Sequence, residues 1–266
     1  MTRTNDRAGA AGGERPTVVV GVDGSAASRD VLVHALVAAA RRGADVEVVS
    51  SFAVDLYYLG MVLPDMSELR DDVSGRVRAL VDEARADAAV SQLPGLRDIE
   101  IRLVVCERPP AVELVRRSHE ALLLVVGSRG RGATRSALLG SVALHCATHA
   151  PCPVLIVHPT PVETRRRPRV IVGVDGSDGS RAALAAAMEE AVRAGGELEV
   201  VSTYAPTDYW TDLASIVVPS VEDIRSRIRE AAVELVDAVL AERSERRVRS
   251  PRTSSSRSSR GGRGRS

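Results

Sequence analysis

The sequence predicts an α/β fold with an open parallel sheet, because strand-like and helix-like segments alternate and one such unit occurs twice. A β-branched run from Val18 to Val22 ends in Asp-Gly-Ser, and an apolar helical periodicity begins after it. The same order returns from Val170 at a constant offset of 152 residues. A repeat of this length indicates duplicated domains rather than a solenoid, whose repeats span about 20 to 50 residues.

The first copy continues the alternation. Further strands are expected at Val46 to Ser50, Ile99 to Val105, Ala121 to Val126 and Val154 to Val157, with helices at about Ser67 to Val90, Ala111 to Ser118 and from Ser141. This order predicts five parallel strands covered by helices on both faces, with ligands beyond the carboxyl ends of the strands.

The second copy is shorter. After strand, helix and strand, a helix is expected from about Val221 to Ala241, and the counterpart of Gly127 would fall at position 282 in a chain of 266 residues. The last segment is rich in Arg, Ser, Gly and Pro, which favours disorder, and one hypothesis for this abrupt change is an altered reading frame. The predicted organisation is a disordered N-terminal tail (1–15), a complete domain (16–160), a linker (161–168), a truncated second domain (169–243) and a disordered basic tail (244–266).

The charge is unevenly distributed. The formal net charge is +1, yet residues 1–245 carry 28 basic and 35 acidic residues, a net charge of −7, and eight arginines follow Glu245. An acidic body argues against a nucleic-acid surface on the fold, so such binding is unlikely and only the tail could supply it. No stretch approaches the roughly 20 apolar residues of a membrane span, and the first residues lack the apolar core of a signal peptide, so we expect a cytoplasmic protein without membrane contact.

Cysteine and histidine give no metal prediction. Cys106, Cys146 and Cys152 have no CxxC spacing, so small apolar fillers are the expected role. His145 and His149 lie at i and i+4 on one helix face, but no third ligand accompanies them. We therefore predict no metal site in the protein itself.

A glycine-rich loop follows the strand that ends at Val126. Glycines at 127 and 130 let main-chain N–H groups approach a phosphate or ribose without an intervening Cβ. After Gly140, Ser141 is the expected N-cap of a helix whose free N–H groups suit an anion. Three arginines could add a charge-assisted contact: Arg129, Arg131 and Arg135.

The spacing G-x2-G-x9-G-S on a strand-to-helix crossing, together with Asp23 and the ending from Ala150 to Val157, resembles the ATP-binding universal stress proteins. The resemblance covers Thr17 to Pro159 and, as a half copy, about Arg169 to Glu242. It implies a Rossmann-like sheet of the adenine-nucleotide α-hydrolase-like type, and a tandem-domain chain whose second domain is truncated.

The resemblance also implies a regulatory protein of the stress response that binds ATP, with or without Mg²⁺. It assigns the adenosine end to Asp23 and to the backbone near Ser51. It assigns the phosphate end to the loop and helix start: Gly127, Gly130, Gly140, Ser141 and the Val142 amide. Of the three arginines, Arg129 is included among the predicted binding residues. Relatives of this kind pair through the last strand, which implies a homodimer through Pro153 to Val157. The chain departs from the usual pattern at Ser50 and at Cys106 to Pro110.

Three alternatives stay open. The glycines could form only a tight turn, with Asp23 and Ser25 capping the first helix. The fold could instead serve an ATP-hydrolysing or adenylyl-transferring enzyme, although the chain has no lysine and no nucleophile elbow, so no catalytic residue is named. The basic tail could bind nucleic acid. In the second domain, Asp175 and Ser177 are expected only to cap a helix.

Overall fold

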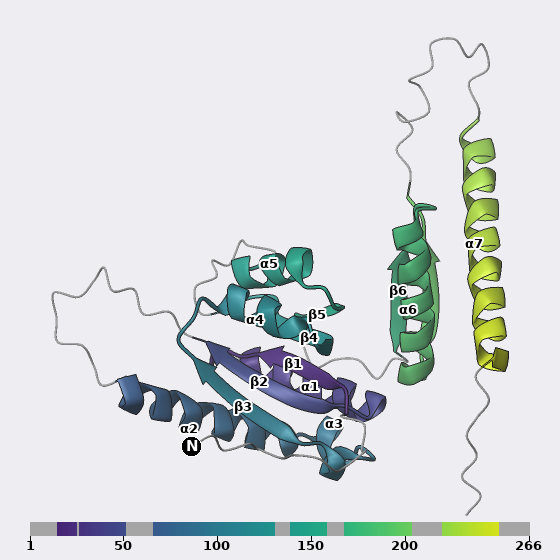
Figure 1. Cartoon of the computed structure of the whole chain (residues 1–266). Coiled ribbons are helices and arrows are strands. Elements are labelled where there is room, and N and C mark those ends of the chain that lie inside the picture. The colour runs from purple at the N-terminus through teal and green to yellow at the C-terminus, as the bar shows by residue number, and fades with distance from the viewer. Residues whose placement is uncertain are drawn as a thin grey trace, which may run out of the picture. The chain divides into compact units, whose positions relative to one another are not determined.

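The computed structural model describes residues 15–25, 27–51, 66–130, 139–158, 168–203 and 220–249. The chain divides into two compact units, Met1–Val162 and Glu163–Ser266, a division that falls inside the linker expected from the sequence (Figure 1). The expectations of a disordered N-terminal tail, a linker and a disordered basic tail concern mostly residues outside the described ranges: 1–14, 161–167 and 250–266.

The first unit contains a five-stranded sheet. Its strands are β1 (Thr17–Gly21), β2 (Asp45–Ser51), β3 (Ile101–Cys106), β4 (Ala121–Gly127) and β5 (Val154–Val157). They lie in the order β3-β2-β1-β4-β5, and every neighbouring pair is parallel. The predicted α/β fold with an open parallel sheet is therefore confirmed. Strand β1 lies at the centre, and β5 lies at an edge.

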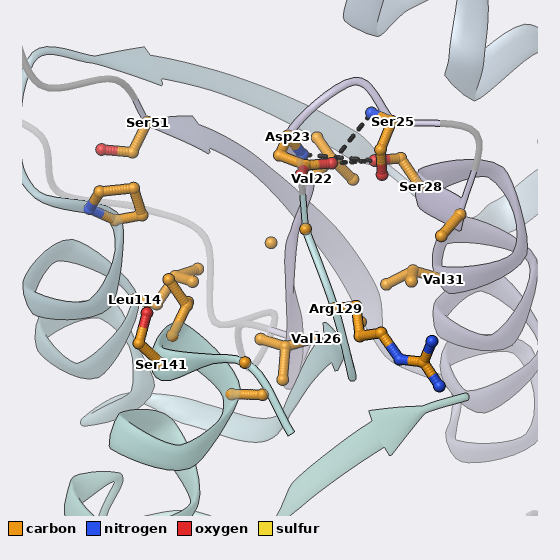
Figure 2. A pocket seen from close by; sticks show the side chains of 18 of the residues that line it. Val22, Asp23, Ser25, Ser28, Val31, Ser51, Leu114, Val126, Arg129 and Ser141 are labelled. Atoms are coloured by element: carbon orange, nitrogen blue, oxygen red, sulfur yellow. Dashed lines mark hydrogen bonds between the residues drawn. The ribbon is translucent and has the colours of Figure 1, made fainter. Parts of the chain in front are cut away.

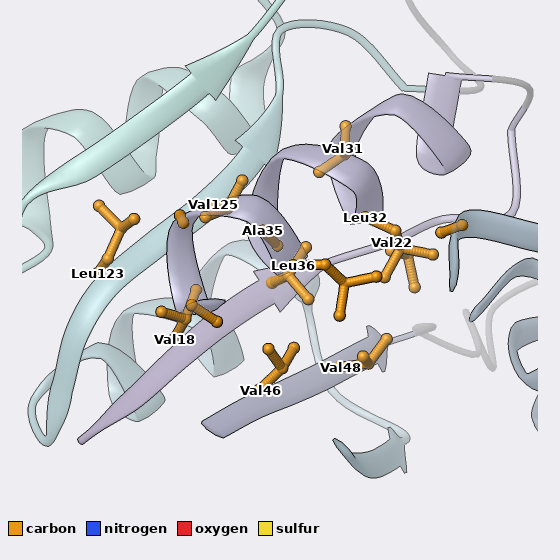
Figure 3. Close-up of a cluster of buried hydrophobic side chains, with 14 of the residues drawn as sticks. Val18, Val22, Val31, Leu32, Ala35, Leu36, Val46, Val48, Leu123 and Val125 are labelled. Atoms are coloured by element: carbon orange, nitrogen blue, oxygen red, sulfur yellow. The ribbon is translucent and has the colours of Figure 1, made fainter. Parts of the chain in front are cut away.

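Helices cover both faces of this sheet (Figure 1). The helices of one face are α1 (Ala27–Arg42), α2 (Met66–Arg85) and α3 (Ala88–Ser91), and those of the other are α4 (Pro110–Ser118) and α5 (Ser141–His149). Val18 (Figure 3) and Val20 pack among the side chains of α1, whereas Val19 packs among those of α4 and α5. Burial on both faces explains why β1 is a continuous apolar run rather than an alternating one.

The second helix differs from its prediction. The expected single helix from about Ser67 to Val90 is two helices, because the helical conformation is interrupted between Arg85 and Ala88. Asp87 caps α3 by accepting a hydrogen bond from the Ala89 amide at 2.9 Å, and its other oxygen lies 2.5 Å from Nη2 of Arg29 on α1. A capping aspartate ends one helix and starts another, which the apolar periodicity does not reveal.

The second unit contains two parallel strands, β6 (Arg169–Gly173) and β7 (Glu197–Val201), and two helices, α6 (Asp178–Ala194) and α7 (Val221–Arg249). Its core includes Val172, Leu184 and Val239. Helix α7 continues past Ala241, so residues 244–249, expected in the disordered tail, are helical. The Glu and Arg residues there are good helix formers, and basic composition alone concealed this.

None of the described helices is both long and apolar enough to cross a membrane. Cys106, Cys146 and Cys152 are free thiols. Cys146 is fully buried beside β4, and burial raises the pKa of its thiol to about 11. It therefore packs as an apolar residue and stays protonated at neutral pH.

Candidate functional site

A cavity of about 480 Å³ lies at the carboxyl ends of the central strands of the first domain (Figure 2). This is where the strand order reverses from β1 to β4, the usual position of ligands in open α/β sheets. All the site residues proposed from the sequence line it: Asp23, Ser51, Gly127, Arg129, Gly130, Gly140, Ser141 and Val142. The cavity thus gathers segments that are more than a hundred residues apart in the chain.

Asp23 is held by the turn that follows β1. Its Oδ1 accepts hydrogen bonds from the Ser25 amide and the Ser28 hydroxyl, both at 2.9 Å (Figure 2). The Ser28 hydroxyl in turn accepts from the amides of Asp23 and Gly24, at 3.3 and 3.2 Å. Gly24 has a φ of 74°, which favours glycine at this point of the turn. The carboxylate is therefore fixed before any ligand arrives.

Gly130 brings the loop after β4 against this carboxylate. A Cβ at position 130 would lie 2.8 Å from Oδ2 of Asp23, so a side chain there would push Asp23 aside. A Cβ at Gly127 would lie 3.2 Å from Val31 on α1 and 3.3 Å from the Arg129 carbonyl. Both glycines thus permit a close approach of main chain that other residues would hinder.

The start of α5 forms the other side of the cavity. The N-cap is Gly140 rather than Ser141, because the Gly140 carbonyl accepts the bond from the Leu144 amide, and Ser141 is the first helical residue. The prediction of Ser141 as N-cap was therefore wrong by one position. Among the described residues no side chain caps this helix, and Ser141, Val142 and Ala143, whose amides are the first of the helix, line the cavity. Such amides lack intrahelical acceptors and suit an anion.

Of the three arginines proposed to contact a phosphate, Arg129 alone lies within the described residues. Arg129 lines the cavity, but its side chain is exposed and its guanidinium is directed toward α1 rather than toward Ser141 (Figure 2). Arg131 and Arg135 lie outside the described residues. Among the described residues, the main-chain N–H groups at the start of α5 are therefore the candidate phosphate donors, and the Arg129 guanidinium is not directed toward them.

The segment that departs from the family pattern lies beside Ser51. The Ser51 hydroxyl at the end of β2 donates a hydrogen bond to the Arg108 carbonyl. This bond joins β2 to the segment that leads into α4, where Pro109 is the N-cap and Pro110 the first helical residue. Pro110 lines the cavity, so this segment contributes part of the wall.

Much of the remaining wall is apolar, and the sequence reasoning did not assign it. Its apolar members are Val22, Ala27, Val31, Val49, Pro110, Leu114, Val126, Leu139 and Ala143. Many of them end a strand or lie in the first turns of the next helix, a position that could have been read from the strand boundaries. An apolar wall beside a few polar groups is the usual setting for a flat ring system with polar substituents.

Within its described residues, the second domain repeats the Asp-Gly-Ser turn but not the rest of the candidate site. Asp175 accepts from the Ser177 amide at 3.0 Å, and the hydrogen bonds from Ser177 lower the pKa of this aspartate. The Ser177 hydroxyl accepts from the Ser180 amide at 3.1 Å, which confirms Ser177 as the N-cap of α6. The Ser180 hydroxyl donates to the Ser177 carbonyl at 2.9 Å, and its counterpart Ser28 donates to Oδ1 of Asp23, also at 2.9 Å.

The two histidines of α5 pack against each other. The rings of His145 and His149 stack with centroids 4.2 Å apart, and Nδ1 of His149 lies 2.7 Å from the Thr148 hydroxyl. Within the described ranges, no group of three or more His, Cys, Asp or Glu side chains is placed to hold a metal ion.

The chain is similar to known proteins in sequence and in structure. The model of the "Universal stress protein family" matches twice, at residues 14–158 and 167–257. A universal stress protein of Mycobacterium tuberculosis (strain H37Rv) is 30% identical over 229 residues, which is 83% of this chain and 72% of the relative. The crystal structure of a universal stress protein from Archaeoglobus fulgidus DSM 4304 is 23% identical with a TM-score of 0.52, over 88% of this chain and 83% of that one. Another match, a universal stress protein solved in complex with cAMP, is 30% identical with a TM-score of 0.39, over 55% of this chain and 99% of that one. The chain belongs to the universal stress protein family.

Proposed function

We propose that the first domain binds an adenine nucleotide, in the first instance ATP, and that its occupancy regulates a response to stress in the cytoplasm. The observation that carries this proposal is the convergence of three features on one cavity of about 480 Å³. These features are the fixed Asp23 carboxylate, the Gly127–Gly130 approach and the α5 start without a side-chain cap.

Each feature fits a different part of the ligand. A carboxylate accepts hydrogen bonds from ribose hydroxyls or an exocyclic amino group, and the apolar wall accommodates the adenine ring. The main-chain amides at the start of α5 would receive the phosphates. Asp23 is the one carboxylate among the described lining residues, so a Mg²⁺ ion would depend mainly on the nucleotide's own phosphates.

The same wall favours binding over catalysis. Among its described residues, the ionisable side chains are Asp23 and Arg129, and Oδ1 of Asp23 already accepts two hydrogen bonds. The chain contains no lysine to pair with transferring phosphates. Retention of ATP without turnover is therefore the expected behaviour.

Assembly is a further part of the proposal. Strand β5 lies at the edge of the sheet and pairs with β4 in the described part of the chain. Val154, Leu155 and Ile156 are half-buried there. An apolar edge strand is a template for pairing, so two chains are proposed to join through Pro153–Val157.

Calorimetric titration of the full chain with ATP, AMP and cAMP tests the site. In Gly130→Ala, the added Cβ displaces Asp23, and we expect ATP affinity to fall by about tenfold or more, equivalent to about 1.4 kcal/mol. The matched control is Gly75→Ala on α2, where a Cβ meets no atom within 4 Å and affinity should be unchanged.

The titrations test separately whether a nucleotide binds and whether it binds in this cavity. A wild-type chain that binds none of the three nucleotides would overturn the function, whereas equal affinity in Gly130→Ala would overturn the site. Incubation with labelled ATP adds a third reading. Stoichiometric retention supports a binding protein, and repeated turnover would indicate the enzyme alternative.

A further inference from the structure

Strand β6 of the second domain has one edge that no other described strand pairs with. Among the described strands it pairs only with β7, whereas its counterpart β1 lies between β2 and β4. The Glu197 amide donates to the Pro168 carbonyl, and the Val174 amide donates to the Val201 carbonyl, both at 2.9 Å. Backbone groups of successive residues point to opposite sides of a strand, so those of Arg169, Ile171 and Gly173 point away from β7.

Arg169 and Ile171 direct their side chains to the face opposite the core, and Gly173 has no side chain. Val172 packs beside Leu184 in the domain core and is 7% exposed. Ile171, on the other face, is 57% exposed. Its counterpart in the first domain, Val19, is 2% exposed. An open strand edge with an exposed isoleucine at its centre is a template for another strand.

We propose that β6 pairs antiparallel with β6 of a second copy of this chain, about a two-fold axis at Ile171. In this register Ile171 lies opposite Ile171 of the partner subunit, and Arg169 lies opposite Gly173 of the partner subunit. All three outward-pointing residues then become hydrogen-bonded pairs, and the two β6–β7 ribbons join into one four-stranded sheet.

The side chains favour this occupant over an unrelated strand. The sole charged residue of β6, Arg169, meets a glycine across the axis, so no like charges oppose each other. It can also keep its ion pair with Glu199, at 3.0 Å, because that contact lies within its own ribbon. In-register parallel pairing would instead place the two copies of Arg169 side by side. The antiparallel register brings the two Ile171 side chains together while it keeps the two copies of Arg169 apart.

Charge variants at the axis test the register directly. Ile171→Asp and Ile171→Lys each place like charges opposite one another, whereas a mixture places opposite charges there. Full-length chains labelled at the N-terminus with a donor or an acceptor are mixed, and energy transfer is measured against concentration. We expect the affinity of self-association to fall by about tenfold in each variant alone. In a mixture of Ile171→Asp with Ile171→Lys, most of the wild-type affinity should return.

The control is the same charge pair at Val192, an exposed residue of α6 that lies away from the β6 edge, where no preference is expected. Circular dichroism checks that the variants fold, as the exposure of Ile171 predicts. Preferred Asp–Lys pairing supports the proposal. Equal transfer in all three mixtures, which pairing through β5 alone would give, overturns it, and so does a wild-type chain that stays monomeric. Neither reading depends on nucleotide binding.

Discussion

Val19 in the first domain and Ile171 in the second occupy the same position of the repeat, yet 2% of the former and 57% of the latter is exposed. Their backbones are alike, since both lie in a strand before an Asp-Gly-Ser turn. The two turns even share a left-handed glycine, with φ of 74° at Gly24 and 83° at Gly176. What differs is the covering layer, because α4 and α5 pack over Val19. Local sequence thus determines the turn, and distant elements determine burial.

The same comparison distinguishes a candidate ligand site in the first domain from a helix cap in the second. Asp23 and Asp175 each bond the amide two residues on, at 2.9 and 3.0 Å. Within the described residues, a glycine loop after a further strand lies beside the aspartate in the first domain alone, where a Cβ on Gly130 would lie 2.8 Å from Oδ2 of Asp23. A duplicated turn therefore becomes a candidate ligand site through what meets it, and not through its own residues.

The largest expected effect comes from the two cores. Leu32 and Leu184 are counterparts with 1% and 0% exposure, so truncation to Ala should cost about 3 kcal/mol at either position. The second domain buries less surface and has less stability to lose. Hydrogen exchange by mass spectrometry should therefore show α6 unprotected in Leu184→Ala, but α1 still protected in Leu32→Ala. Retained protection of α6 would contradict a marginal second domain.

A charged network around a buried carboxylate of the first domain gives the next effect. Glu113 on α4 is buried, and hydrogen bonds from Arg116, then from Arg117, lower its pKa to about 2. Arg117 also donates to Glu47 on β2 at 2.6 Å, which joins the covering layer to the sheet. Glu113→Gln leaves these arginines partly unpaired, and urea unfolding at pH 7 should show a loss of about 2 to 3 kcal/mol.

The sign of the pH dependence follows from the lowered pKa. The carboxylate contributes its full stability above the ordinary pKa of 4.5, and the contribution is lost as the pH falls toward 2. The difference between wild type and Glu113→Gln should therefore shrink from pH 5 to pH 3. Asp72→Asn, which breaks the exposed ion pair with Arg76, is the control and should change stability by less than about 0.5 kcal/mol. A constant difference across this range would refute an ionised Glu113.

A hydroxyl tests the covering layer itself. Val19→Thr keeps the side-chain shape but buries a polar group, at a cost of about 1 to 2 kcal/mol. Ile171→Thr, measured at concentrations too dilute for association, should cost less than about 0.5 kcal/mol because water reaches the site. Local hydrogen exchange in β1 and β6 gives both values. Similar costs at the two positions would mean that Ile171 is covered in solution.

Much of the first domain could be predicted from sequence because its signals are local. Short β-branched runs, Asp-Gly-Ser turns and the Gly127–Gly130 spacing each predict their own geometry, and the parallel order follows from alternation. The break at Asp87 and the cap at Gly140 were missed because each depends on a hydrogen bond and not on hydrophobic periodicity.

The apolar wall of the cavity was missed for another reason. Leu114 and Val31 come from helices on opposite faces of the sheet, and only the fold brings them to one cavity. The buried charge network has the same origin, since Glu47 and Glu113 are far apart in sequence. Periodicity identifies which residues are buried, but it does not identify their partners.

The smallest expected effect compares two glycines that end equivalent strands. A Cβ on Gly21 would lie 2.8 Å from Cδ1 of Leu114, whereas a Cβ on Gly173 would meet no atom within 4 Å. Gly21→Ala should therefore cost about 1 kcal/mol by overpacking, and Gly173→Ala should stabilise its strand by roughly 0.5 kcal/mol. Leu114 lines the cavity, so Gly21→Ala should also weaken ATP binding a few-fold in calorimetry, which Gly173→Ala should not. Equal destabilisation at both positions would mean that a covering layer lies over β6 as it does over β1, because only a side chain above the glycine can oppose the added methyl group.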